Sequence, residues 1–302
     1  MAEICSLSRI PNPESRIPEP AVPELPEVEA VRRQLRRVME GARIQRVETR
    51  RADLRSPFPS DFAARLEGQK VKALRRRAKY LLADLESGET LLMHLGMSGS
   101  FRVVKGRRDA VQGDFYFERS RLDAHDHVLL TMSSGAIIVF NDPRRFGQMD
   151  IIEAGGLTIN RALKSLGPEP LDRGFNATTL AHALKGKKTT LKAALSDQRV
   201  VAGLGNIYVC EALHRAGLSP KRRASTLATA TGAPRPGAKA LADAIQAVLM
   251  EAIANKNRYQ GNDRFRVYDR EGQRCPRRGC PGTIKRIVQT GRSTFFCPVC
   301  QK

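Results

Sequence analysis

Apolar positions near the start of the chain follow the period of an amphipathic helix. The apolar residues that follow Pro26 are Val28, Val31, Leu35, Val38 and Met39. Most of them lie three or four residues apart, which places them on one face of a helix. Glu27 falls in the first turn, where the helix dipole favours an acid, and Gly41 marks the end. The pattern predicts a helix between Pro26 and Gly41.

From Ile44 to about Glu153 the apolar runs shorten to the length of strands. The predicted strands include Lys70–Arg75, Tyr80–Leu85, Thr90–Leu95, Val128–Met132 and Ala136–Phe140. Turn signals such as Ser87-Gly88 and Ser134-Gly135 separate them. This region is typical of an antiparallel sandwich or barrel packed behind one helix.

A stretch rich in glycine and proline then interrupts the strand pattern, and helical spacing follows it. The predicted helices are Ala177–Leu184, Thr190–Asp197, Ile207–Arg215 and Ala238–Ala254. The sequence thus divides into a first domain at 23–155, a linker at 156–170, a helical domain at 171–260 and a cysteine-rich segment at 266–302. The last segment has few apolar residues, so we expect it to fold around a metal.

Residues 1–22 show neither the helical nor the strand period of apolar residues. They contain Pro11, Pro13, Pro18 and Pro20 and lack the apolar core of a signal peptide. We expect them to form a disordered extension. Because no apolar run approaches the length of a membrane span, we also expect a cytoplasmic protein that does not enter a membrane.

The charge balance narrows the choice of partner. Lys and Arg number 52 against 31 Asp and Glu, a net charge of +21, and 41% of the residues are hydrophobic. That apolar content excludes a chain that is disordered throughout. The excess of positive charge favours a polyanionic partner, most often nucleic acid. Charge alone also fits a ribosomal type of protein or a basic protein that binds a lipid surface.

Four of the six cysteines lie in the last 28 residues. Cys275 and Cys280 have four residues between them, sixteen more precede Cys297, and Cys300 closes the set. Two such knuckles joined by a short hairpin indicate a zinc ribbon, and four thiolates leave no open position for a metal-bound water. The alternative interpretation is that these cysteines are reduced residues of a hydrophobic core, but this segment is too small to form such a core. We therefore expect one structural zinc.

Seven short motifs follow one another along residues 23–302. They are Pro23-Glu-Leu-Pro-Glu-Val-Glu29, Arg76-Arg-Ala-Lys-Tyr-Leu-Leu82, His94-Leu-Gly-Met-Ser-Gly99, His125-Asp-His127, Asp142-Pro-Arg-Arg-Phe-Gly147, Gly203-Leu-Gly-Asn-Ile-Tyr208 and Gly291-Arg-Ser-Thr-Phe-Phe-Cys-Pro-Val-Cys300. With these motifs the chain resembles the bacterial formamidopyrimidine-DNA glycosylases, which excise oxidised purines and then cut the strand as abasic-site lyases. The opening motif separates it from the sibling endonuclease VIII group, which prefers oxidised pyrimidines.

The resemblance implies an α+β fold. An N-terminal antiparallel β-sandwich with flanking helices would be followed by a helix–two-turns–helix domain and a C-terminal zinc ribbon, the same order that the patterns predict. Double-stranded DNA with oxidised purine lesions would lie across the cleft between the two halves. We expect a monomer associated with the nucleoid.

The resemblance also implies roles for individual residues. The catalytic residues would be Pro23, Glu24, Lys79 and Arg292. The residues that fill the gap left by an extruded nucleotide would be Met97, Arg144 and Phe146, whose side chains can replace stacking. Further DNA contacts would come from His125, Asn206 and one of Lys187 or Lys188.

The implied chemistry needs a free amine at Pro23. A terminal amine titrates near about 7.7–8.0, so part of it is unprotonated and can attack the sugar. In the printed chain the nitrogen of Pro23 is an amide and cannot form an imine. A GUG codon gives valine within a gene and methionine at its start, so Val22 suggests that translation begins there and that removal of methionine exposes Pro23.

One segment departs from the family pattern. The stretch from Asn255 to Phe265 is shorter than the glycine-rich loop that covers the extruded purine in family members. A shorter cover excludes water less well and offers fewer groups to the base. We expect normal cleavage of abasic sites but weaker excision of 8-oxoguanine than of ring-opened formamidopyrimidines, and single-turnover assays on the three substrates test this.

Three other functions stay open at this point. An endonuclease VIII-like enzyme would prefer oxidised pyrimidines. A non-catalytic protein that binds damaged DNA would form no borohydride-trapped complex. A zinc-ribbon RNA-binding protein would not depend on Pro23 or Glu24.

Overall fold

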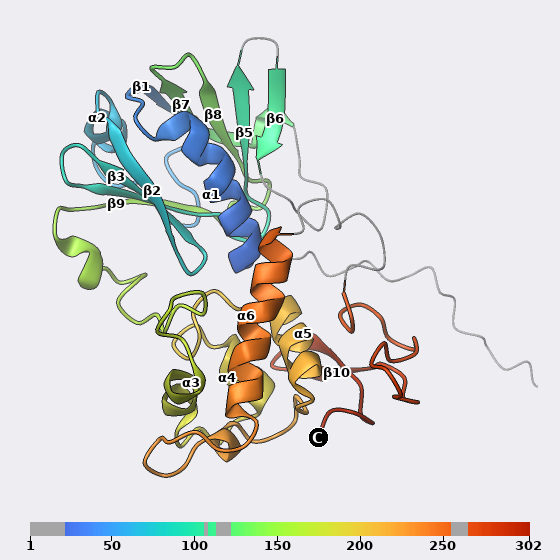
Figure 1. The fold of residues 1–302 in the computed structure, drawn as a ribbon. Helices are drawn as coiled ribbons and strands as arrows, with labels where there is room; N and C mark the ends of the chain where they lie inside the picture. The colour runs from blue at the N-terminus through green and yellow to red at the C-terminus, as the bar shows by residue number, and fades with distance from the viewer. Residues whose placement is uncertain (1–21, 106–107, 113–121, 255–264) are drawn as a thin grey trace, which may run out of the picture.

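The computed structural model describes residues 22–105, 108–112, 122–254 and 265–302. These residues form two lobes, one built mainly of strands and one mainly of helices (Figure 1). The predicted extension at 1–22 lies outside the described residues except for Val22, and the short segment from Asn255 lies outside them up to residue 264. Both expectations therefore stay untested.

Two antiparallel sheets make the first lobe. One has the order β2-β3-β4-β9 and the other the order β1-β7-β8-β5-β6. Their strands are β1 (Ile44–Thr49), β2 (Val71–Arg77), β3 (Tyr80–Leu85), β4 (Thr90–His94), β5 (Ser100–Lys105), β6 (Arg108–Gln112), β7 (Asp126–Met132), β8 (Ile137–Asn141) and β9 (Gln148–Ile152). The short helices of this region are α2 (Phe62–Leu66) and single 3-10 turns at Asp123–His125 and Gly156–Thr158. Two stacked sheets confirm the predicted sandwich.

Helix α1 (Leu25–Met39) lies along the sandwich as the first apolar pattern predicts. Val28, Val31, Leu35 and Met39 are buried in the core that also contains the inward-facing residues of both sheets. Leu25, at the first position of the helix, belongs instead to the core of the second lobe. The start of α1 thus sits where the two lobes meet.

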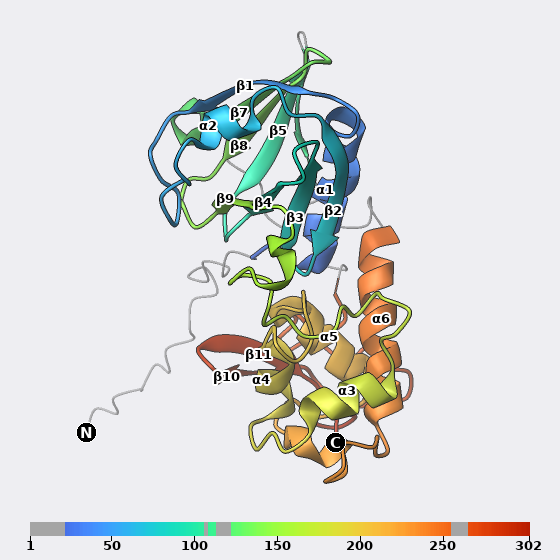
Figure 2. The ribbon, with the colours of Figure 1, turned by 90° about the vertical axis from the view of Figure 1, so that its left-hand side faces the viewer.

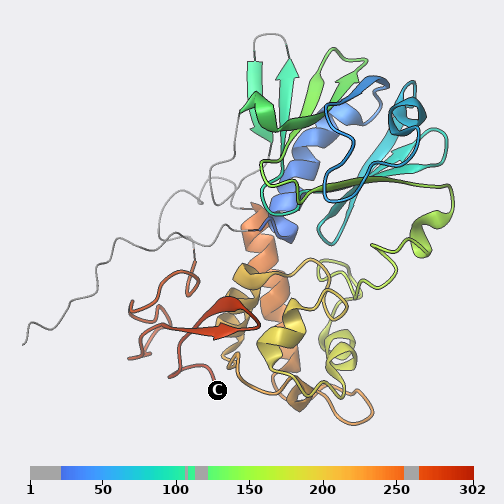
Figure 3. The same ribbon diagram turned by 180° about the vertical axis from the view of Figure 1, so that it is seen from behind.

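The second lobe contains four helices and a two-stranded ribbon among its described residues. They are α3 (Ala177–Leu184), α4 (Leu191–Ser196), α5 (Asn206–Ala216), α6 (Ala238–Ala254), a 3-10 turn at Ala224–Leu227, β10 (Lys285–Gln289) and β11 (Arg292–Phe296). Figures 2 and 3 show the ribbon on the flank of the helices. One apolar core joins the helices to the ribbon, so the cysteine-rich segment does not stand alone.

The α+β fold class is confirmed, and α3 and α6 have the predicted bounds. Strand β3 also has the predicted bounds, and the other predicted strands and helices differ by one or two residues at their ends, where caps and bulges decide the boundary. None of the described helices has both the length and the apolar character needed to cross a membrane.

Candidate active site

Glu24 and Glu27 lie at the start of α1, and their carboxyl groups make different contacts. The Glu27 carboxylate caps the helix, because it accepts the N–H of Glu24 at 3.0 Å. It also accepts the Tyr208 hydroxyl at 2.6 Å. The carboxyl of Glu24 points to the other lobe, where it accepts the N–H groups of Ile207 at 2.9 Å and Tyr208 at 3.4 Å. Glu24 and Glu27 thus form the capping box of α1, and the Glu24 carboxyl also binds the start of α5.

The loop Gly203-Leu-Gly-Asn206 gives Glu24 its place. Leu25 donates its N–H to the carbonyl of Gly203, and Gly203 has a φ of +85°, a conformation that glycine adopts readily. A Cβ added at Gly205 would lie 2.3 Å from Cδ of Glu24. This glycine motif thus lets the N-terminus of α5 close over the carboxyl, where backbone N–H groups attract an acid.

Burial dominates the electrostatics of this acid. Glu24 is 2% exposed, and burial raises its pKa from 4.5 to about 7, although the nearby charge of Lys79 acts in the opposite direction. Burial also lowers the pKa of Lys79, with the charges of Glu24 and Arg292 acting against each other. The three side chains therefore share one environment, and Glu24 can hold or release a proton near neutral pH.

The raised pKa of Glu24 predicts a pH-dependent change in stability. Below pH 4.5 the Glu24 carboxyl is protonated in both the folded and the unfolded chain. Between pH 4.5 and about 7 it ionises only in the unfolded chain. The free energy of unfolding therefore falls as the pH rises through this range. Glu24→Gln stays neutral, so its stability relative to the wild type should increase by about 3 kcal/mol between pH 4.5 and 8, at about 1.4 kcal/mol per pKa unit. Urea unfolding at both pH values tests this, and a constant difference would contradict it.

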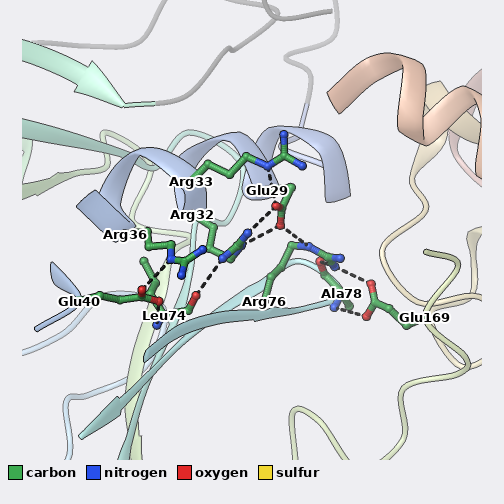
Figure 4. Close-up of polar contacts among 9 residues, drawn as sticks. All are labelled: Glu29, Arg32, Arg33, Arg36, Glu40, Leu74, Arg76, Ala78 and Glu169. Atoms are coloured by element: carbon green, nitrogen blue, oxygen red, sulfur yellow. Dashed lines mark hydrogen bonds and ion pairs between the residues drawn. The ribbon is translucent and has the colours of Figure 1, made fainter. Parts of the chain in front are cut away.

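Lys79 lies in the turn between β2 and β3, and Glu169 holds that turn from the second half of the chain (Figure 4). Glu169 accepts the N–H of Ala78 at 2.9 Å and a guanidinium N–H of Arg76 at 2.5 Å. Arg76 also donates to Glu29 of α1 at 3.2 Å. Buried, charge-assisted contacts of this kind fix the backbone that leads into Lys79.

Arg292 is the first residue of β11, directly after the turn of the ribbon. Its side chain is exposed. The amide of Asn206, at the start of α5, donates to the carbonyl of the next residue, Ser293, at 2.8 Å. The ribbon is thereby tied to the helix end that binds Glu24, so Arg292 stands at the same site.

Pro23 directly precedes Glu24 and is buried. Its nitrogen is joined to Val22 in the printed chain. The structure thus brings four sequence-predicted residues together from three distant parts of the chain: Pro23, Glu24, Lys79 and Arg292.

Met97 lies on the loop after β4, and Arg144 and Phe146 lie on the loop after β8. The guanidinium of Arg144 lies over the ring of Phe146, 4.7 Å from its centroid, and Phe146 is 42% exposed. A Cβ at Gly96, next to Met97, would lie 2.3 Å from the backbone of Phe146. The two loops therefore touch backbone to backbone.

His94 is a residue that the sequence reasoning missed as a site residue. It pairs with Tyr80 across β3 and β4, and burial together with the charge of Lys79 lowers its pKa to about 4. Nδ1 accepts the N–H of Gly96 at 3.0 Å, so the proton of the neutral ring is on Nε2. Glu169 was missed as well, because it lies in the stretch rich in glycine and proline at 156–170, which the sequence pattern marks only as a linker. A histidine that ends a strand before a glycine loop was the available signal for His94.

The remaining predicted contacts lie further out. His125 is half-buried, and its carbonyl accepts the N–H of Asp142, which leads into the Arg144 loop. Lys187 and Lys188 lie between α3 and α4 on the second lobe. Their roles in DNA binding stay predictions.

The four cysteines fit one structural zinc ion. Their sulfur atoms lie within 4.8 Å of one another, with 3.8 Å between Cys275 and Cys300 and 3.6 Å between Cys280 and Cys297. This spacing suits a tetrahedral thiolate site. The ring of His214 lies 3.4 Å from the sulfur of Cys275, which attaches the cluster to α5.

Comparison with known proteins agrees with this arrangement. Residues 22–149 match the formamidopyrimidine-DNA glycosylase N-terminal domain, residues 166–262 its H2TH domain and residues 272–302 the zinc finger found in FPG and IleRS. Formamidopyrimidine-DNA glycosylases of Bradyrhizobium sp. (strain ORS 278) and Nitrobacter winogradskyi are each 59% identical and match over their whole length and 93% of this chain.

Solved structures of the family have the same fold. The Lactococcus lactis enzyme, bound non-covalently to DNA with an AP site, is 29% identical, covers 93% of this chain and 100% of its own, and has a TM-score of 0.77. MutM of Thermus thermophilus is 36% identical over 92% of this chain and 98% of its own, with a TM-score of 0.74. From its three domains, its glycine-lined acid and its cysteine cluster, the chain belongs to the formamidopyrimidine-DNA glycosylase family.

Proposed function

We propose that this protein removes oxidised purines from double-stranded DNA and then cleaves the strand at the abasic site. The observation that carries the proposal is the buried Glu24 carboxyl, which adjoins Pro23 and shares its environment with Lys79 and Arg292. An acid with a pKa near 7 beside Lys79, which itself feels the charge of Arg292, suits proton transfer beside phosphates.

Pro23 is the nucleophile of the proposed reaction, once its nitrogen is a free amine. The nitrogen attacks C1′ of the sugar as the bond from C1′ to the base breaks and the base leaves with the electron pair. The proton on nitrogen passes to the departing base, and opening of the sugar ring, with Glu24 protonating the ring oxygen, gives an iminium. Nearby cations lower the pKa of the amine and keep part of it unprotonated.

Glu24 is the acid and base of the proposed reaction. Its carboxyl gives a proton to the ring oxygen as the bond between that oxygen and C1′ breaks. As a carboxylate it then takes the proton from C2′, and the 3′ phosphate leaves in β-elimination. A δ-elimination releases the 5′ phosphate. A pKa of about 7 lets one group act in both directions.

Lys79, His94 and Arg292 contact the phosphates around the lesion in this proposal. The Arg292 guanidinium can bind a phosphate through two N–H groups, and the neutral His94 ring can donate from Nε2. Asn206, His125 and one of Lys187 or Lys188 extend the contact along the strand. We expect the protein to act as a monomer at the nucleoid.

Met97, Arg144 and Phe146 act as the wedge, the name we use for these three side chains. A purine inside a duplex is out of reach, so the nucleotide must leave the stack before it meets Pro23. A thioether, a guanidinium and an aromatic ring can fill the gap that remains.

The choice of substrate separates this proposal from an endonuclease VIII-like enzyme. We expect faster release of formamidopyrimidines and 8-oxoguanine than of oxidised pyrimidines from matched duplexes. A single-turnover comparison of purine and pyrimidine lesions tests this. Faster release of the pyrimidines would favour the alternative.

We expect zinc and Arg292 to have separate roles, because the metal supports the fold of the ribbon and the arginine contacts DNA. Cys297→Ser should lose zinc and unfold the ribbon, because thiolate binding supplies much of its folding free energy. Arg292→Ala should keep one zinc but bind DNA less tightly, and lower the slope of log affinity against log salt by about 1. Metal analysis and salt titration measure both, and equal loss of zinc in the two variants would refute the division.

A further inference from the structure

Asp142 joins the loops that carry the wedge. Its side chain is fully buried at the end of β8, with 0% exposed. One carboxylate oxygen accepts the hydroxyl of Ser98 at 2.5 Å, and the other accepts the N–H of Gly147 at 2.7 Å. Ser98 follows Met97 and Gly147 follows Phe146, so each oxygen holds the neighbour of a wedge residue.

Arg144, the third wedge residue, is linked to the Asp142 carboxylate through Ser98. The N–H of Arg144 donates to the Ser98 hydroxyl oxygen at 3.2 Å, while that hydroxyl donates to Asp142. A Cβ at Gly147 would lie 3.0 Å from the Asp142 carboxylate, so the loop approaches the acid as closely as glycine permits. One carboxylate thus determines where all three wedge side chains begin.

The backbone of Asp142 adds a third segment. Its N–H donates to the carbonyl of His125 at 2.9 Å, and its carbonyl accepts Nε2–H of His127 at 2.9 Å. The His125-Asp-His127 motif is therefore fixed relative to the wedge loops. These contacts link three motifs that are separate in sequence.

We propose that Asp142 is the positioning residue of the wedge, and that its carboxylate holds the Met97 loop and the Arg144–Phe146 loop in the arrangement that enters the DNA stack. This inference rests on the proposed function, because the wedge is part of it. A carboxylate can accept both hydrogen bonds at once, whereas an amide has only one accepting oxygen. Asp142→Asn should therefore release one of the two loops while retaining most of the buried volume.

The test measures extrusion of the base in the full 302-residue chain, where it does not depend on imine formation at Pro23. The duplex carries 8-oxoguanine beside 2-aminopurine, whose fluorescence rises when its neighbour leaves the stack. With the wild type the fluorescence should rise. With Asp142→Asn the rise should be about 10-fold slower or smaller, in the range expected for a misplaced loop.

Matched variants separate positioning from folding. Ser98→Ala removes the link to Arg144 and should reproduce part of the loss of fluorescence rise, even if Asp142→Asn fails to fold. Ser98→Thr keeps the hydroxyl and should restore the fluorescence rise. Asp150→Asn is the control, because the Asp150 carboxylate accepts the N–H of Ile151 on β9. A normal rise with Asp142→Asn and Ser98→Ala would overturn this inference alone. No rise with the wild type would overturn it together with the proposed function.

Discussion

A chain that begins at Pro23 should cleave DNA at an abasic site at least about 100-fold faster than a chain that begins at Val22. With Val22 in place the proline nitrogen is an amide and has no basic lone pair. The free amine then sits one residue away, about 3.8 Å along the chain. A displacement of even 1 Å can lower a rate about 100-fold. Single-turnover strand cleavage by the two proteins measures the difference.

The pair is closely matched, because the chains differ only by Val22, which is half-buried, and keep all the site residues. Equal melting temperatures and equal zinc content would show that only the amine has changed. Similar cleavage rates for the two chains would remove Pro23 from the role of nucleophile.

Glu24→Gln should lower excision about 100- to 10,000-fold, the range expected for loss of an acid–base group. Glutamine can still accept the N–H of Ile207, so the junction between α1 and α5 should persist. DNA affinity should therefore change little. Glu27→Gln is the matched control on the same helix, since Glu27 caps α1 and contacts Tyr208. If Glu27→Gln slowed excision as much as Glu24→Gln did, the assignment of Glu24 would fail.

The fold was largely predictable from local pattern. The period of the apolar residues between Pro26 and Gly41 gave α1, and alternation with turn signals gave the sandwich. Short strands such as β5 and β9 were not among those we named, because their identity depends on pairing with distant strands. The domain boundaries that we drew stay a prediction.

The candidate site was predictable as a set of residues but not as an arrangement. The motifs identified Glu24 and Lys79, yet nothing local indicates that Ile207 and Tyr208 would bind the Glu24 carboxyl. Glu169 lies 91 residues from Ala78 and holds its N–H. Contacts over such distances follow from the docking of the two lobes, which residue spacing does not encode.

Borohydride trapping tests the proposed imine at Pro23 most directly, with the protein that begins at Pro23 and a duplex containing 8-oxoguanine opposite cytosine. Reduction of an imine leaves a stable covalent bond between protein and DNA. We predict one covalent complex per lesion, with peptide mapping that places the link at Pro23. A protein that cleaves this duplex without becoming linked to it, or that is linked through Lys79, would contradict the account.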